Sequence, residues 1–216
     1  VTKFKNGDLI GVGVFVDSCG NCDNCNRGME HFCREGMTGT YNSLERDGET
    51  IAFGGYSNYF VIKERYAVSI PSNLDLTGVA PLLCAGVTTW SPLKHWNVKE
   101  GSKVAVVGLG GLGHMAIKLA KGLGAEVTLF SRTPGKTEDA KQLGTDHVVI
   151  STDEESMKSV FNKFDLIIVS HTSPNRIHCE TNPLYPSDHL YSKSDVIFAD
   201  AESKQEQFLI LYQKKS

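Results

Sequence analysis

The stretch that decides the fold is Val104-Ala105-Val106-Val107-Gly108-Leu109-Gly110-Gly111-Leu112-Gly113. Its apolar start predicts a buried strand, and the pattern G-x-G-x-x-G leads directly into a segment with helical periodicity. In that context Gly108 permits a tight turn, Gly110 lets the backbone approach a pyrophosphate, and Gly113 lets helix and strand pack closely. Amide groups at the start of the helix attract anionic phosphate. The sequence therefore predicts a dinucleotide site; the alternative is a glycine-rich turn without a ligand.

Strands and helices alternate on the carboxyl side of this loop. The predicted strands are 103–107, 126–130, 147–150 and 165–169, and the predicted helices are 111–123, 135–143 and 154–162. This order is typical of a parallel sheet with helices on its faces. Residues 76–95, before the loop, are apolar and long enough for a helix. After residue 170 the pattern ends, and only 194–199 and 207–212 remain as candidate short strands.

The second predicted strand ends at Ser131 without the acidic residue that an NAD site usually has there to bind the ribose hydroxyls. Ser131, Arg132 and Lys136 stand there instead. A hydroxyl and two cations suit a 2′-phosphate, so the sequence favours NADP. The alternative is that the two cations are solvated surface charges.

Four cysteines, Cys19, Cys22, Cys25 and Cys33, fall within fifteen residues of polar sequence. Their spacing, C-x2-C-x2-C-x7-C, suits one tetrahedral Zn²⁺, and four thiolates leave no open position, which indicates a structural site. A disulfide cluster of a secreted protein and an iron–sulfur cluster are the alternatives.

The cysteine-rich part lies between two predicted strands, 8–17 and 55–63, and is interpreted as part of a β domain that lacks its first strands. The composition is that of an ordinary globular protein, with 40% apolar residues and a net charge of −3 over 216 residues. A near-neutral chain gives no electrostatic case for nucleic-acid or membrane-surface partners. No apolar run approaches the roughly 18 residues of a membrane span. We see no signal core, and we expect a cytoplasmic protein.

Together these motifs resemble the zinc-dependent medium-chain alcohol dehydrogenases, and most of all the cinnamyl alcohol dehydrogenase branch with its bacterial broad-range aldehyde reductases. The resemblance covers residues from about 5 to about 170. It rests on the four-cysteine lobe, the glycine loop, and the stretches 37–42, 54–57, 81–89 and 91–93.

The resemblance implies an α/β architecture in three parts. Residues 1–75 correspond to a partial GroES-like domain with the zinc lobe, 76–170 to the first, NADP-binding half of a Rossmann fold, and 171–216 match nothing. Cys84 corresponds to the last protein ligand of the catalytic zinc, and Thr88 to a residue that contacts the nicotinamide. Ser131, Arg132, Thr133 and Lys136 correspond to the 2′-phosphate pocket. Taken alone, Cys84 would be read as a small buried residue.

The implied activity is hydride transfer between a small alcohol or aldehyde and NADP, with zinc acting as a Lewis acid. The family's G-x-C-H-x-D and G-H-E stretches are not found, and His31, His95 and His114 are not read as replacements, so the catalytic zinc site is expected to be incomplete. His178 and Cys179 are assigned no metal.

We therefore expect a truncated, weakly active or inactive dehydrogenase. No firm dimer is expected, since the family's dimer contacts lie mainly in its second half. The rival interpretations are a non-catalytic zinc-stabilised nucleotide-binding module, an unstable fragment, and a relative of the polyol dehydrogenases.

Overall fold

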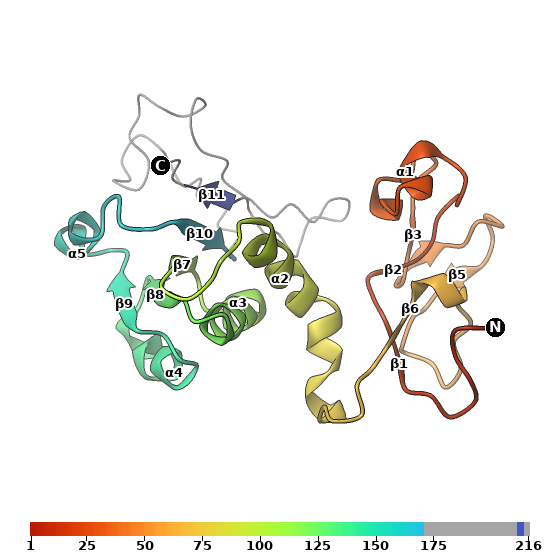
Figure 1. Cartoon of the computed structure of the whole chain (residues 1–216), viewed down its shortest axis with the longest axis horizontal. Coiled ribbons are helices and arrows are strands. Elements are labelled where there is room, and N and C mark those ends of the chain that lie inside the picture. The colour runs from red at the N-terminus through yellow and green to blue at the C-terminus, as the bar shows by residue number, and fades with distance from the viewer. Residues whose placement is uncertain (171–210, 214–216) are drawn as a thin grey trace. The chain divides into compact units, whose positions relative to one another are not determined.

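The computed structural model describes residues 1–170 and 211–213. The predicted strand at 194–199 and the pair His178 and Cys179 lie outside the described residues. The chain divides into two compact units, Val1–Cys84 and Ala85–Ser216 (Figure 1). Among the described residues, no helix has the length and apolar content needed to cross a membrane.

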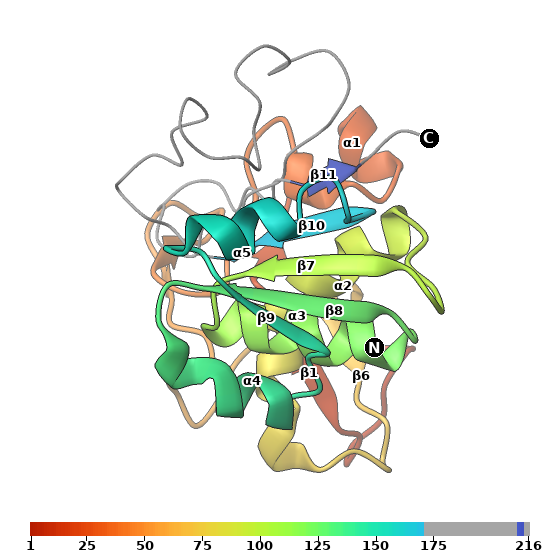
Figure 2. The same cartoon turned by 90° about the vertical axis from the view of Figure 1, so that its left-hand side faces the viewer.

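The second unit is built on a five-stranded sheet. Its strands are β7 (Lys103–Val107), β8 (Glu126–Ser131), β9 (His147–Ile150), β10 (Leu166–Val169) and β11 (Leu211–Gln213). Their order in the sheet is β11-β10-β7-β8-β9 (Figure 2). Strands β7, β8, β9 and β10 are parallel to one another, whereas β11 runs antiparallel beside β10. The predicted parallel sheet of a Rossmann-type half is confirmed.

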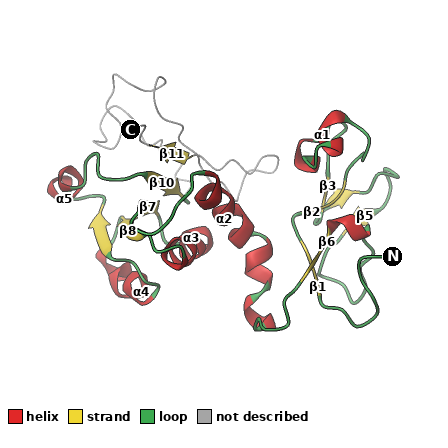
Figure 3. Ribbon diagram, viewed as in Figure 1, coloured by secondary structure: helices red, strands yellow, loops and turns green. Residues whose placement is uncertain are grey.

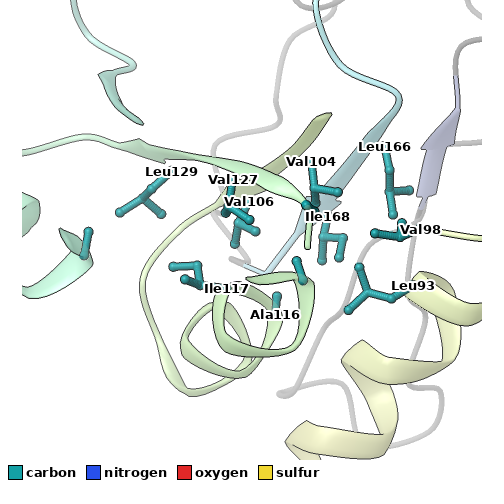
Figure 4. Packing of buried hydrophobic residues seen from close by; sticks show 13 residues of the cluster. Leu93, Val98, Val104, Val106, Ala116, Ile117, Val127, Leu129, Leu166 and Ile168 are labelled. Atoms are coloured by element: carbon teal, nitrogen blue, oxygen red, sulfur yellow. The ribbon is translucent and has the colours of Figure 1, made fainter. Parts of the chain in front are cut away.

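Helices cover both faces of this sheet because alternate side chains of each strand point to opposite faces. Val104 and Val106 of β7 pack with α2 (Ala85–His95), α3 (Gly111–Gly122) and α4 (Thr137–Gln142). Ala105 packs on the other face with Met157 of α5 (Glu154–Ser159). Figure 4 shows Ile117 and Ala116 of α3 and Leu93 of α2 directed at the sheet. This core places the carboxyl ends of β7 and β8 side by side.

The first unit consists mostly of loops, as Figure 3 shows. Its strands form three antiparallel pairs. They are β1 (Ile10–Val12) with β6 (Ala67–Ser69), β2 (Phe15–Asp17) with β3 (Thr38–Gly39), and β4 (Ser43–Leu44) with β5 (Ile51–Ala52). Its helical segments are α1 (Asp23–Asn26) and the 3₁₀ segments Glu30–Phe32, Glu64–Tyr66, Leu76–Gly78 and Ala80–Leu83.

The predicted strand at 55–63 is wrong. The segment contains the aromatic and β-branched residues that are typical of a strand, yet the side chains of Tyr56 and Tyr59 are both 91% exposed. The hydroxyl of Ser57 donates to the carbonyl oxygens of Gly54 and Tyr59 at 3.0 and 2.7 Å, which folds the segment into turns. The next strand is β6, which starts at Ala67.

Other predicted elements have different ends. The strand at 8–17 is split into β1 and β2, and the helix expected at 76–95 becomes an α-helix only from Ala85, after two 3₁₀ segments. The helix expected at 135–143 begins with the 3₁₀ segment Pro134–Lys136, and the one expected at 154–162 ends at Ser159. The predicted strand at 207–212 overlaps β11 in two residues.

Candidate functional site

Four thiols converge at the tip of the first unit. The sulfur atoms of Cys19, Cys22, Cys25 and Cys33 all lie within 4.8 Å of one another. The Sγ atom of Cys25 is 3.8 Å from that of Cys19 and 3.5 Å from that of Cys22. A tetrahedral zinc with bonds of about 2.3 Å separates its sulfur ligands by about 3.8 Å. The spacing of the thiols therefore suits a single ion of this kind.

The local backbone holds the sulfur atoms in place and favours their ionised form. The amide of Cys19 donates to Sγ of Cys33, and the amide of Cys22 donates to Sγ of Cys19, each at 3.4 Å. The backbone amides of Arg34 and Cys25 lower the pKa of the Cys22 thiol to about 6. Because a thiolate is the form that binds metal, these amides prepare the cluster for a cation.

Among the alternatives for this cluster, a single zinc ion fits best. All four cysteines are free thiols, so the structure pairs none of them in a disulfide. An iron–sulfur cluster places several atoms between its thiolates and needs a wider cage than this one. Four sulfur donors fill a tetrahedron, which gives the ion a structural role and leaves no position for a substrate.

The glycine loop joins β7 to α3 in the second unit. Gly108 has φ of +92°, a backbone conformation that residues with a side chain rarely adopt. Its amide donates to the carbonyl oxygen of Phe130 at 3.0 Å. Gly110 is the N-cap of α3. A Cβ atom on Gly113 would lie 2.1 Å from the carbonyl oxygen of Gly108, so no other residue fits there without a shift of the backbone. The first amides of α3 thus face outward from a tight turn, as an anion site requires.

Ser170 supports this loop and was missed by the sequence analysis. It directly follows β10, and its hydroxyl lies 3.0 Å from the carbonyl oxygen of Val107 and 3.1 Å from that of Gly108. The signal that could have found it is its position at the carboxyl end of a strand adjacent to β7 in a parallel sheet.

The residues at the end of β8 lie beside the glycine loop. The ammonium of Lys136 donates to the carbonyl oxygen of Leu109 at 3.4 Å. Ser131 is buried, and its hydroxyl donates to the carbonyl oxygen of Thr133 at 2.8 Å and accepts from the Thr133 amide at 3.3 Å. Arg132 is exposed and has no charged partner in the part of the chain that the structure describes. The edge of the nucleotide loop is therefore cationic.

The two residues expected at the catalytic centre lie in different settings. Cys84 is exposed, follows the 3₁₀ segment Ala80–Leu83, and belongs to no group of three or more metal-ligating side chains within 1–170 and 211–213. Thr88 is half-buried in α2, where the neighbouring Thr89 bonds back to the carbonyl oxygen of Ala85 at 2.7 Å. His31, His95 and His114 likewise belong to no such group among these residues.

Two family models match the chain. Residues 1–72 match the alcohol dehydrogenase GroES-like domain, and residues 111–177 match the zinc-binding dehydrogenase model. The NADP-dependent alcohol dehydrogenase C 1 of Mycolicibacterium smegmatis is 53% identical over 169 residues, which make up 78% of this chain and 48% of that protein.

Solved structures of the cinnamyl alcohol dehydrogenases are also similar. The Sorghum bicolor enzyme matches with a TM-score of 0.76 and 42% identity over 80% of this chain and 49% of its own. The Helicobacter pylori enzyme, solved in complex with NADP(H), matches with a TM-score of 0.71 and 44% identity over 79% of this chain and 48% of its own. The chain thus spans about half the length of the relatives it matches.

Proposed function

The chain belongs to the zinc-dependent alcohol dehydrogenase family, and from this premise we propose that it carries the structural-metal and NADP-binding parts of an enzyme that interconverts small alcohols and aldehydes. The observation that carries the proposal is the cationic edge of the glycine loop, where Lys136 reaches the carbonyl of Leu109 and no acid ends β8. A relative whose name states NADP dependence and a similar structure solved in complex with NADP(H) support the same cofactor.

In this proposal the chain's own residues bind and orient the cofactor. The first amides of α3, freed by the turn at Gly108 and Gly110, hold the pyrophosphate. Arg132 and Lys136 bind the 2′-phosphate together with Ser131 and Thr133. NADP, when bound, supplies or accepts the hydride. The sheet core beneath the loop keeps these groups at fixed positions.

The two zinc roles are divided between different cysteines. Cys19, Cys22, Cys25 and Cys33 hold an ion that orders the lobe. We assign Cys84 as a ligand of the catalytic ion and Thr88 as a contact of the nicotinamide, in keeping with the family resemblance. A catalytic zinc, when bound, polarises the substrate oxygen. It needs three protein ligands, and Cys84 is the one that the family resemblance assigns; among the described residues Cys84 belongs to no group of three or more metal-ligating side chains.

A polypeptide of these 216 residues alone should therefore turn over substrate weakly or not at all. The second candidate function, a non-catalytic nucleotide-binding module, is favoured by the exposure of Cys84 outside any ligand group of the described residues. The two differ in one assay, since a module binds NADP without alcohol-dependent reduction. A cytoplasmic location, which would keep the free thiols reduced, and the absence of a firm dimer remain predictions.

Cofactor binding tests the proposal. By calorimetry, the chain should bind NADP at least about tenfold more tightly than NAD. Replacing Lys136 by Ala should weaken NADP binding about tenfold, the equivalent of about 1.4 kcal/mol, with little change for NAD. Lys99→Ala is the matched control, because Lys99 is an exposed lysine before β7. An equal loss for both nucleotides, or no binding of either, would overturn the assignment.

A further inference from the structure

Four consecutive residues, Lys63 to Tyr66, join the cysteine lobe to the rest of the first unit. Lys63 pairs with Asp17 at 2.6 Å, and Arg65 pairs with Glu30. The carboxylate of Glu64 accepts the amide of Thr2 at 2.7 Å, so the opposite side of the segment is tied to the start of the chain. The hydroxyl of Tyr66 lies 2.7 Å from that of Ser18. The last of these links leads to the thiol cluster through Ser18.

Ser18 stands between Tyr66 and a cysteine of the cluster. Its Oγ atom is 3.2 Å from Sγ of Cys25, so the three side chains form a continuous row. All three are buried, with Cys25 and Ser18 each 3% exposed and Tyr66 9% exposed. Cys25 is the most buried of the four thiols. Its sulfur is therefore shielded from water, and its hydrogen bonds must come from the protein.

Metal binding determines the direction of these hydrogen bonds. A free thiol can donate its proton to Ser18, as the geometry allows. A metal-bound thiolate has no proton and can only accept, so the Ser18 hydroxyl must then donate to Cys25. Since Ser18 has one proton, the Tyr66 hydroxyl must in turn donate to Ser18. Both hydroxyls can satisfy this order without moving.

The ring of Tyr66 is held independently of its hydroxyl. It contacts Phe15 edge-on, with ring centroids 5.6 Å apart, and the guanidinium carbon of Arg65 lies 5.4 Å from its centroid. These contacts point the hydroxyl at Ser18 before any ion binds. They also mean that phenylalanine can replace tyrosine here while the packing of the ring is retained.

We propose that Tyr66 and Ser18 are positioning residues for the structural metal, and that they form a hydrogen-bond relay, Tyr66 to Ser18 to Cys25, which stabilises the Cys25 thiolate in its ligand position. This inference rests on the proposed four-cysteine metal site and extends it by two residues outside the ligand set. The relay tightens metal binding because hydrogen bonds to a ligand orient it and offset its buried charge.

Metal competition in the whole 216-residue chain tests the relay. Tyr66→Phe should weaken zinc binding about tenfold, and Ser18→Ala between about 10-fold and 100-fold, as measured by transfer of zinc to a chromogenic chelator. The double variant should lose no more than Ser18→Ala alone, because Tyr66 acts through Ser18. Ser18→Thr, which keeps a hydroxyl, should recover most of the affinity. Tyr59→Phe is the control, since Tyr59 is fully exposed outside the lobe.

Cobalt provides a readout that a merely structural role would not change. With Co²⁺ in the cluster, loss of the hydrogen bond to Cys25 in Ser18→Ala should move the sulfur-to-metal charge-transfer band to lower energy. Weakening of that bond in Tyr66→Phe should move the band in the same direction by less, and Tyr59→Phe should leave it unchanged. Lower stability with an unchanged band, or zinc affinity equal to the parent chain, would overturn the relay alone. If the parent chain binds no zinc or cobalt, the proposed metal site fails, and the relay fails with it.

Discussion

The cysteine lobe and the parallel sheet are ordered by different means. Around the sheet, one face alone buries thirteen apolar residues of the described part of the chain, contributed by strands, helices and connecting segments. Across the whole first unit, the buried apolar residues are Val16, Cys25, Ala52, Tyr66, Ala67 and Val79. One of these six is itself a member of the thiol cluster. The sheet is stabilised by burial of apolar surface, whereas the lobe has too little of it to order its backbone alone.

The difference indicates which perturbation each region tolerates. A structural ion contributes its binding free energy to folding, so loss of one ligand affects the whole lobe. A packed sheet distributes its stability over many contacts. It is damaged instead when a substitution adds an atom at a position where the packing leaves no space for it.

Loss of the metal should have the largest effect. Cys33→Ser, or treatment with a strong chelator, should abolish hydrogen-exchange protection in residues 18–34, because structural zinc contributes on the order of 10 kcal/mol to such sites. Protection in 103–130 should not change. Cys84→Ser serves as the matched control for the lobe, since Cys84 lies outside the thiol cluster. Retention of protection in the metal-free lobe would show that side-chain packing orders it after all.

Gly113→Ala should have the next largest effect, this time on the sheet unit. The added methyl group meets the carbonyl oxygen of Gly108 at 2.1 Å and the hydroxyl of Ser170 at 2.9 Å, so the loop must shift. We expect a loss of about 3 kcal/mol in the free energy of unfolding and at least a tenfold loss of NADP affinity. Denaturant titration and calorimetry measure both.

Gly122→Ala, at the end of the same helix, is the control for this substitution. Apart from the adjacent residues and the backbone of its own helix, no atom of the described residues lies within 4 Å of its added methyl group, so stability should stay equal or rise by up to about 1 kcal/mol. If Gly113→Ala behaved like Gly122→Ala, the close approach of α3 to the glycine turn would not be needed.

The smallest expected effect concerns Asp146, which links two elements of the sheet unit. Its carboxylate accepts the amide of Val127 at 2.6 Å and pairs with Lys121 at 2.9 Å. Burial raises the pKa of this carboxyl, but the Val127 amide and the Lys121 ammonium outweigh burial, so the pKa lies below its ordinary value. A depressed pKa means that the stabilisation is full above about pH 4, the unfolded value, and is lost as the pH falls through the folded value.

Asp146→Asn should therefore cost roughly 0.5–1 kcal/mol at pH 7, a small value because solvent screens the pair, and almost nothing near pH 2. Thermal melts at the two pH values measure the difference. Glu100→Gln is the control, because Glu100 is exposed and pairs with no cation in the described part of the chain. An equal cost at both pH values would assign the role of Asp146 to something other than its charge.

The sheet could be predicted from the sequence because its signals are local. The apolar run into Gly108 and the helical spacing that follows are contained in one short stretch. The segment at 55–63 was misread because its aromatic and β-branched residues are typical of a strand, while the turn depends on a single serine hydroxyl. Tyr66 could not be found from sequence, because it acts on Ser18, which lies 48 residues away along the chain. Ser170 contacts Gly108 across 62 residues, and the one signal for it was its position after a strand of the parallel sheet.

The pair of hydrogen bonds between Ser131 and Thr133 has a consequence for cofactor choice. The Ser131 hydroxyl already donates its single proton to the Thr133 carbonyl oxygen and accepts a hydrogen bond from the Thr133 amide. A phosphate that accepts this proton must replace the hydrogen bond to the Thr133 carbonyl oxygen. Ser131 therefore adds little net free energy to phosphate binding, because one hydrogen bond is lost for each one formed. Discrimination between the two nicotinamide nucleotides then falls on Lys136 and on Arg132, whose guanidinium pairs with no carboxylate among residues 1–170 and 211–213. A redesign of that preference should begin with these two side chains and leave the serine in place.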